Sequence, residues 1–245
     1  MKQIITFLLI FFTLTIISQN GEITYSIKMD KNNTISKKID STNANPTSAS
    51  MDVLMGALKK SISNFDDVEF KLTFNDNESH YAYIEAMDTE NSELPNMLRN
   101  MIIESGRKYN YNYKTKIISK QSEFEGEKYI IKSHSDSLKW KFENDKKTIN
   151  GYKCNKATTV KYKKYPSGIK EIPVTAWYSL DLLIPIGPGR YNGLPGLIIE
   201  LQEGDKILFI KKIIFSKTVK KIKKLKGKIV TEEEFEKIWR WSLND

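Results

Sequence analysis

Alternating hydrophobic and polar residues dominate the chain and predict a mainly β protein. Apolar side chains occupy every second position from residue 68 to 74, and the same period of two returns at Tyr109, Tyr111 and Tyr113. This period places successive side chains on opposite faces of a strand. Further short apolar runs, separated by turn residues, continue to residue 215. We therefore expect one strongly twisted antiparallel sheet, for which an open half-barrel is one form.

Helical spacing of apolar residues appears in three places. Ser50 can cap a helix whose apolar positions are 54, 58, 62 and 65, and a second helix is predicted over Leu94–Glu104, with Pro95 in its first turn. Thr231, followed by three glutamates, predicts the start of a C-terminal helix that ends near Trp241. We expect two or three helices, including the C-terminal one, to pack on the sheet.

The N-terminus has the pattern of a secretory signal peptide. A basic start is followed by an apolar stretch over residues 4–17 and then by polar residues 18–20. The stretch is shorter than the roughly 20 residues that span a membrane. The pattern predicts a signal peptide over residues 1–19 and a single domain over residues 20–245. An uncleaved anchor is the alternative. The expected location is the periplasm, the cell surface or the medium, without a later membrane span.

Cysteine content and charge narrow the class of protein. Cys154 is the only cysteine, so stability comes from packing rather than from an intrachain disulfide. The net charge of +9 is unevenly spread: residues 20–145 carry 17 basic and 20 acidic side chains, and residues 146–245 carry 21 and 10. For an exported protein we expect no nucleic-acid partner. The basic half can face anionic lipid headgroups or an acidic partner, although a solvated lysine-rich surface is the simpler explanation.

Few residues form a pattern that indicates catalysis or metal binding. His80 and His134 have no further histidine or acid at a metal-ligand spacing, and no Gly-x-Ser-x-Gly motif is present. Two methionine pairs could hold Cu(I), but such spacing is more typical of a helix core. These pairs, each spaced by one helical turn, are Met51/Met55 and Met97/Met101. We expect no enzymatic activity, no metal site and no cofactor.

The segment Pro185–Gly196 is rich in glycine and proline and predicts a rigid loop at the rim of the sheet. Its prolines remove backbone N–H groups, which argues against phosphate binding. Aromatic residues beside a rigid loop can line an apolar groove for a lipid tail, a peptide or a hydrophobic partner. The candidate binding residues are Trp177, Tyr178, Pro188, Tyr191, Gly193, Leu194, Pro195 and Gly196.

The hexapeptide Gly193–Ile198 resembles the signature of the GLPGLI family, exported proteins typical of Bacteroidetes and of unknown function. The block Gly151–Ala157, the triplet Ala176–Tyr178 and the segment Ile184–Pro188 follow in the order of that family. One departure is Gly189-Arg190-Tyr191, where the family has an aromatic residue, a lysine and another aromatic residue. The resemblance implies an exported, mostly β domain and supplies no catalytic residues.

These features together predict an exported, non-enzymatic protein that binds a hydrophobic ligand such as a lipid or lipoprotein. The alternative is an accessory protein of an outer-membrane complex, with the loop and the basic face as contact surfaces. An enzyme or a Cu(I)-binding protein is the remaining alternative.

Overall fold

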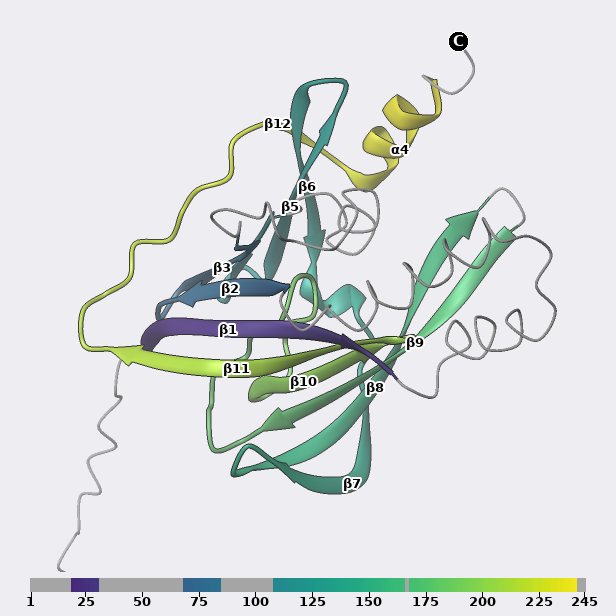
Figure 1. The fold of residues 1–245 in the computed structure, drawn as a ribbon. Coiled ribbons are helices and arrows are strands. Elements are labelled where there is room, and N and C mark those ends of the chain that lie inside the picture. Colours follow the sequence, from purple (N-terminus) through teal and green to yellow (C-terminus); the bar gives the residue numbers. More distant parts are fainter. Residues whose placement is uncertain (1–18, 31–67, 85–107, 166–167, 242–245) are drawn as a thin grey trace, which may run out of the picture.

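The computed structural model describes residues 19–30, 68–84, 108–165 and 168–241, most of which form one twelve-stranded sheet (Figure 1). The strands are β1 (Asn20–Met29), β2 (Glu69–Phe74), β3 (Glu78–Tyr83), β4 (Lys108–Asn112), β5 (Ile117–Phe124), β6 (Glu127–His134), β7 (Lys141–Ile149), β8 (Tyr152–Tyr165), β9 (Gly168–Ser179), β10 (Leu197–Glu203), β11 (Lys206–Ser216) and β12 (Lys228–Val230). The helical elements are the 3₁₀ turn η2 (Ser135–Ser137) and the helix α4 (Glu232–Trp241).

The strand order is β12-β6-β5-β4-β3-β2-β1-β11-β10-β9-β8-β7. Chain-adjacent hairpins build both halves, and the pairing of β1 with β11 joins them. Tyr25 of β1 lies opposite Ile210 of β11 on one side and Phe70 of β2 on the other. Because β1 is an interior strand, Ile23 and Tyr25 are fully buried. The first strand of the domain therefore holds the sheet together.

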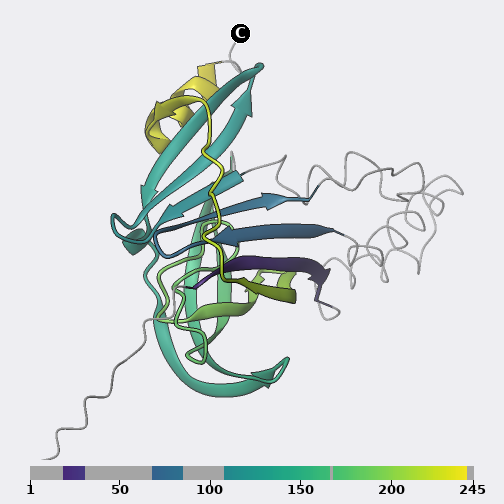
Figure 2. The ribbon, with the colours of Figure 1, turned by 90° about the vertical axis from the view of Figure 1, so that its left-hand side faces the viewer.

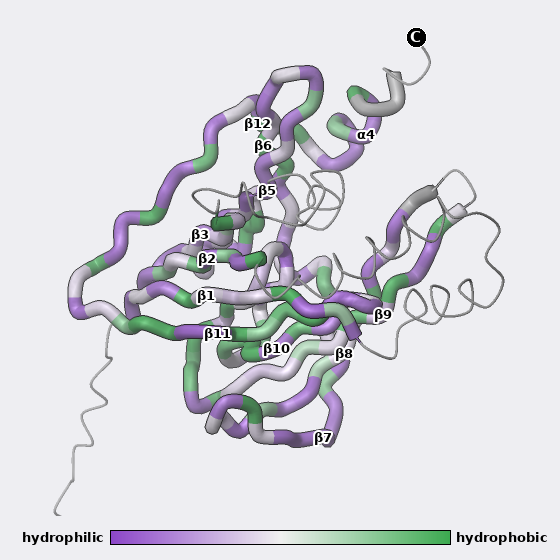
Figure 3. Tube along the Cα trace, in the orientation of Figure 1, coloured by the Kyte–Doolittle hydropathy of each residue, from purple (hydrophilic) through white to green (hydrophobic). Residues whose placement is uncertain are grey.

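The two faces of the sheet differ in polarity, as the alternating hydrophobic and polar sequence pattern requires. In β1 to β3, one face carries apolar side chains, among them Ile27 and Tyr81, and we call it the inner face. The opposite, outer face carries Glu22 and His80 in the same strands. The sheet is bent (Figure 2), and the hydrophobic positions along its central strands are visible in Figure 3. The inner face and the loop between β9 and β10 enclose the core.

The predicted fold class is wrong in its helices and in its sheet geometry. The described residues contain one short α-helix, α4, rather than two or three, and the sheet is open, ending at β12 and β7. It is not wholly antiparallel, because β12 pairs with β6 in parallel. The long connection after β11 returns the chain to the far end of the sheet, so β12 runs in the same direction as β6. The helices predicted over residues 50–65 and Leu94–Glu104 lie outside the described residues, as do both methionine pairs.

The start of α4 follows the predicted capping pattern. Glu234 donates its backbone N–H to the Thr231 hydroxyl at 3.1 Å, and its carboxylate accepts from the Thr231 N–H at 2.7 Å. This reciprocal pair satisfies two of the free donors at the helix start. The ring of Phe235 packs on Tyr129 of β6, with centroids 5.4 Å apart. The C-terminal helix is thus confirmed and packs at the β6 end of the sheet.

Residues 217–227, which we call the basic strap, connect β11 to β12 and contain six lysines. Figure 2 shows the strap running past the central strands towards α4. Within the described part of the chain, no helix has the length and apolar character needed to cross a membrane. The predicted signal peptide, except for residue 19, lies outside that part.

Candidate functional site

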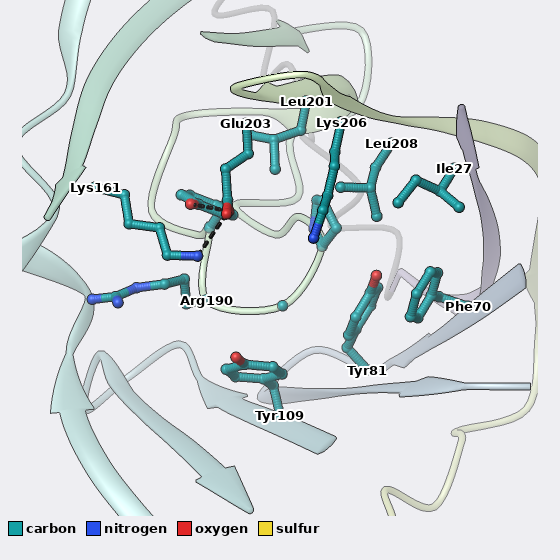
Figure 4. A pocket seen from close by; sticks show the side chains of 13 residues that line it. Ile27, Phe70, Tyr81, Tyr109, Lys161, Arg190, Leu201, Glu203, Lys206 and Leu208 are labelled. Atoms are coloured by element: carbon teal, nitrogen blue, oxygen red, sulfur yellow. Dashed lines mark hydrogen bonds and ion pairs between the residues drawn. The ribbon is translucent and has the colours of Figure 1, made fainter. Parts of the chain in front are cut away.

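A cavity of about 90 Å³ opens on the inner face between the sheet and the loop that joins β9 to β10 (Figure 4). Seven strands and the loop contribute to it. The lining residues are Ile27, Phe70, Tyr81, Tyr109, Lys161, Pro188, Gly189, Arg190, Tyr191, Leu201, Glu203, Lys206 and Leu208.

The apolar wall of the cavity consists of aromatic rings on neighbouring strands. Phe70 stacks on Tyr81 with ring centroids 5.3 Å apart, and Tyr109 meets Tyr81 edge-on at 6.4 Å. Tyr81 and Tyr109 are directly paired across β3 and β4, so both rings must leave the same face of the sheet. Ile27 and Leu208, paired across β1 and β11, extend this wall.

The opposite wall is polar and firmly held. The Lys161 Nζ lies 2.6 Å from Glu203 Oε1, and the Tyr191 hydroxyl donates a 2.5 Å hydrogen bond to Glu203 Oε2. The side chains of Lys161 and Glu203 are only 14% and 17% exposed. Both carboxylate oxygens are therefore satisfied by fixed donors, and this limited access to solvent strengthens the ion pair. Figure 4 shows the Lys161 and Glu203 side chains pointing towards each other at one end of the cavity.

Two further cations, Arg190 and Lys206, line the cavity, and Lys206 lies opposite Glu203 in the pairing of β10 with β11. Among the described residues, neither Arg190 nor Lys206 forms an ion pair, and the Lys206 ammonium points into the cavity near Tyr81 (Figure 4). The Arg190 side chain extends from the loop past Lys161 (Figure 4). An anionic group at the cavity mouth would therefore meet two available positive charges.

A second hollow of about 40 Å³ adjoins the cavity and shares Tyr109, Lys161 and Arg190 with it. Its other lining residues are Ile118, Lys120, Ile131, Ser133 and Glu232. Lys161 belongs to β8 and Lys120 to β5, which are far apart in the strand order. The bend of the sheet brings these strands towards each other, so residues from both line the second hollow.

The loop between β9 and β10 is fixed by its own hydrogen bonds. The buried Asn192 side chain accepts from the Gly187 N–H at 3.2 Å and donates to the Gly189 carbonyl at 3.1 Å. Trp140 Nε1 donates to the Asn192 carbonyl at 3.2 Å. Gly189 has a φ of +62°, in the left-handed region that favours glycine. The cavity rim formed by Gly189 is therefore shaped before any ligand arrives.

The predicted binding residues are divided between the cavity and the packing around it. Pro188 and Tyr191 line the cavity. Leu194 is 1% exposed in the core, Gly193 has a φ of +87°, and Gly196 lies directly against the Ser179 carbonyl. The loop lies under the sheet rather than at its rim, because its apolar residues are buried against the inner face. The hexapeptide is thus chiefly a packing element.

Trp177 and Tyr178 follow each other in β9 and lie outside the cavity lining. Because they are consecutive in a strand, they point to opposite faces. Tyr178 packs on Phe142 with centroids 6.2 Å apart, and Lys147 Nζ lies 4.2 Å above the Trp177 ring. Neither residue is brought together with Pro188 and Tyr191 in the cavity.

Potentially reactive side chains outside the cavity have structural roles. His80 lies on the outer face, 2.6 Å from Asn110 Oδ1, and burial lowers its pKa. Cys154 is 1% exposed, as expected for a core residue, and burial raises the pKa of its thiol. Within residues that the structure describes, no cluster of three or more His, Cys, Asp or Glu side chains could hold a metal ion.

The sequence did not reveal most of the cavity, because its residues come from strands far apart in the chain. Tyr81 and Tyr109 carried a partial signal, since both occupy apolar-face positions of alternating strands. Lys161, Glu203 and Lys206 carried none, because charged residues at such positions resemble ordinary solvated strand residues. The pairing of β11 with β1 places these charged residues beside the aromatic residues of β2 to β4.

Comparison with known proteins gives a short match to a family model and a likeness in fold. A family model described as "Protein of unknown function (Porph_ging)" matches residues 163–200, a stretch that contains Gly193–Ile198. This match is short, and the GLPGLI name is not confirmed. No curated protein matches the chain.

Among solved structures, the chain is similar to PNGF-II in the P21 and C2 space groups. The TM-scores are 0.51 and 0.50 at 14% sequence identity, with 91% of this chain covered. The matched part is 34% and 33% of the PNGF-II chains, so this chain spans about a third of their length. At this identity the likeness concerns the fold alone.

Proposed function

We propose that the protein is an exported, non-enzymatic binding protein whose inner-face cavity accepts the apolar end of an anionic amphiphile. The proposal depends on two features of one cavity. Phe70 and Tyr81 form an aromatic wall. Arg190 and Lys206 also line the cavity, and neither forms an ion pair among the described residues. Apolar surface with a few oriented polar groups is the usual composition of a small-molecule site.

The size of the cavity restricts the ligand. Its volume of about 90 Å³ is below the roughly 150 Å³ of a cavity that holds benzene. The cavity accepts a short apolar group rather than a whole acyl chain, and the rest of the ligand must lie in the second hollow or outside. A lipid is therefore bound by the end of its chain, or a peptide by one apolar side chain.

The arrangement of the acidic group supports a binding role rather than catalysis. Among the described residues that line the cavity, Glu203 is the only carboxylate, and Lys161 and Tyr191 hold both of its oxygens. Glu203 therefore serves as an anchor that fixes the positions of Lys161 and Tyr191.

Isothermal titration calorimetry with straight-chain carboxylates, from butanoate to dodecanoate, tests the proposal. Each methylene that enters the cavity should strengthen binding about fourfold, until the cavity is filled and the gain levels off. Lys206→Gln and Arg190→Gln should each weaken binding by up to about fivefold, since the charges are near the surface. Lys212→Gln, an exposed lysine of β11, is the matched control. Equal affinity across the series, or equal losses in the control, would contradict the proposal.

Export rests on the N-terminal pattern of residues 1–19. Fusion of these residues to alkaline phosphatase that lacks its own leader tests it, because that enzyme is active only after export. Phosphatase activity that depends on the fused segment is expected, and its absence would exclude a signal peptide.

The alternative of partner binding through the hexapeptide has less support. Leu194 is 1% exposed, so its side chain is not available to another protein. A change such as Leu194→Asp would bury a charge and unfold the domain rather than remove a contact.

A further inference from the structure

The basic strap crosses the outer face of the sheet, opposite the cavity, and is held there at regular intervals. Side-chain amides of Asn75 and Asn110 donate to the backbone carbonyls of Lys220 and Lys223, both at 2.9 Å, and Gln121 donates to the carbonyl of Lys226. The anchored carbonyls are three residues apart. Three residues per turn is the repeat of an extended polyproline-like chain, in which every third residue faces the same side.

The apolar residues of the strap have the same three-residue spacing in the sequence. Val219, Ile222 and Leu225 are the apolar residues, and Ile222 is buried against the sheet at 4% exposure. Figure 3 shows hydrophobic positions recurring along a mostly hydrophilic strap. The carbonyl anchors and Ile222 hold the strap on the sheet, while most of its lysines remain exposed to solvent. The strap is thus a row of lysines held in place on the outer face of the sheet rather than a loose linker.

Most of these lysines are not neutralised by the protein. Lys220 lies 3.3 Å from Glu22 and Lys224 lies 2.8 Å from Glu78. Four further strap lysines are exposed and have no carboxylate partner among the described residues. They are Lys217, Lys221, Lys223 and Lys226. The nearby carboxylates are therefore already engaged, and the row keeps an excess of positive charge.

Exposed apolar side chains lie at the start of the same row. Val219 is 73% exposed, and Ile214, which pairs with Glu22 on the outer face near the end of β11, is 46% exposed. Cations combined with exposed apolar groups are typical of surfaces that bind anionic membranes, because the charges meet headgroups and the apolar groups enter the interface. An acidic protein would require matched positions for individual lysines, whereas an extended row of exposed lysines fits a continuous anionic surface.

We propose that the basic strap docks the protein on a membrane surface that contains anionic lipids. This role is separate from the cavity and does not depend on a ligand there. Each lysine near such a surface contributes about 1 kcal/mol, so the removal of three weakens binding roughly 100-fold. The attraction is screened by salt and falls as ionic strength rises.

Co-sedimentation with phosphatidylcholine vesicles, with and without phosphatidylglycerol, tests this proposal on the full chain. We expect binding only to the anionic vesicles and a loss of binding in high salt. The variant Lys221→Gln/Lys223→Gln/Lys226→Gln should bind roughly 100-fold more weakly. The matched control, Lys114→Gln/Lys146→Gln/Lys170→Gln, removes the same charge from exposed positions outside the strap and should bind nearly as well as the unmodified protein.

A third variant, with arginine at positions 221, 223 and 226, keeps the charge and should bind normally, which separates a docking role from a folding defect. Equal losses in the strap and control variants would show that only net charge matters and would overturn the proposal. Binding to neutral vesicles, or binding to polyglutamate but not to anionic vesicles, would also overturn it.

Discussion

The phenol of Tyr25 in β1 donates a buried 2.6 Å hydrogen bond to the backbone carbonyl of Ile198, where the chain leaves the Gly/Pro-rich loop and enters β10. The two residues are 173 positions apart in sequence. Tyr25 is fully buried, and burial raises the pKa of its phenol well above the ordinary value. This bond joins the central strand to the loop that covers the cavity.

Tyr25→Phe should lower the free energy of unfolding by about 1–2 kcal/mol, because the Ile198 carbonyl loses its buried donor while the packing of the ring is kept. Urea denaturation followed by tryptophan fluorescence measures the change. Tyr162→Phe, which removes the hydroxyl of an exposed tyrosine, is the control and should change stability little. Equal losses in both variants would show that the bond has no particular role.

Gly196→Ala should destabilise the protein by about 2–3 kcal/mol, because a Cβ atom there would lie 2.0 Å from the Ser179 carbonyl oxygen. The neighbouring group is backbone and cannot rotate away. Gly193→Ala meets no close atom, but the φ of +87° costs a side chain about 1–2 kcal/mol. Gly196→Ala should therefore have a lower melting temperature than Gly193→Ala in thermal unfolding. The reverse order would contradict the packing described here.

His80 should make the protein less stable as pH falls below about 6.5. Burial, together with the nearby Lys223 and Lys108, lowers its pKa in the folded state, whereas Asn110 acts in the opposite direction. The unfolded chain then binds a proton that the folded chain does not, so stability falls until the folded-state pKa is reached, by at most about 1.4 kcal/mol per pH unit.

Urea midpoints measured between about pH 7.5 and pH 5 test this dependence. His80→Gln should flatten the slope, whereas His134→Gln, at an exposed position, should leave it in place. An unchanged slope in His80→Gln would mean that other groups control the pH response.

Cys154 should resist modification by a thiol reagent until the protein opens. Its side chain is 1% exposed and burial raises its pKa, so the reactive thiolate is both rare and covered. An opening cost of about 3 kcal/mol slows labelling roughly 100-fold relative to the urea-unfolded chain. Labelling of the native protein at the unfolded rate would place the thiol at the surface.

Local features of the fold could be predicted from the sequence. The alternation over residues 68–74 corresponds to β2, and the capping residues Thr231 and Glu234 begin α4 as expected. Both signals depend on neighbours within a few positions of the chain. The same is true of the rigid loop, whose glycines and prolines fix its backbone locally.

Long-range features could not be predicted in this way. The pairing of Tyr25 with Ile210 and the parallel pairing of β12 with β6 depend on how distant segments meet. The candidate site depends on the same contacts, because Lys206 and Tyr109 share a cavity only through that strand order. Aromatic residues close in sequence, such as Trp177, were therefore a poor guide to the cavity.

The most direct measurement of the central claim is methyl NMR of the isotopically labelled protein titrated with octanoate. If the inner-face cavity binds the apolar end of an anionic amphiphile, the methyl signals of Ile27, Leu201 and Leu208 should shift together and saturate. The signals of Leu183 and Ile229, which are exposed and outside the cavity, should remain in place. Shifts confined to the exposed methyls, or none at saturating octanoate, would contradict the account.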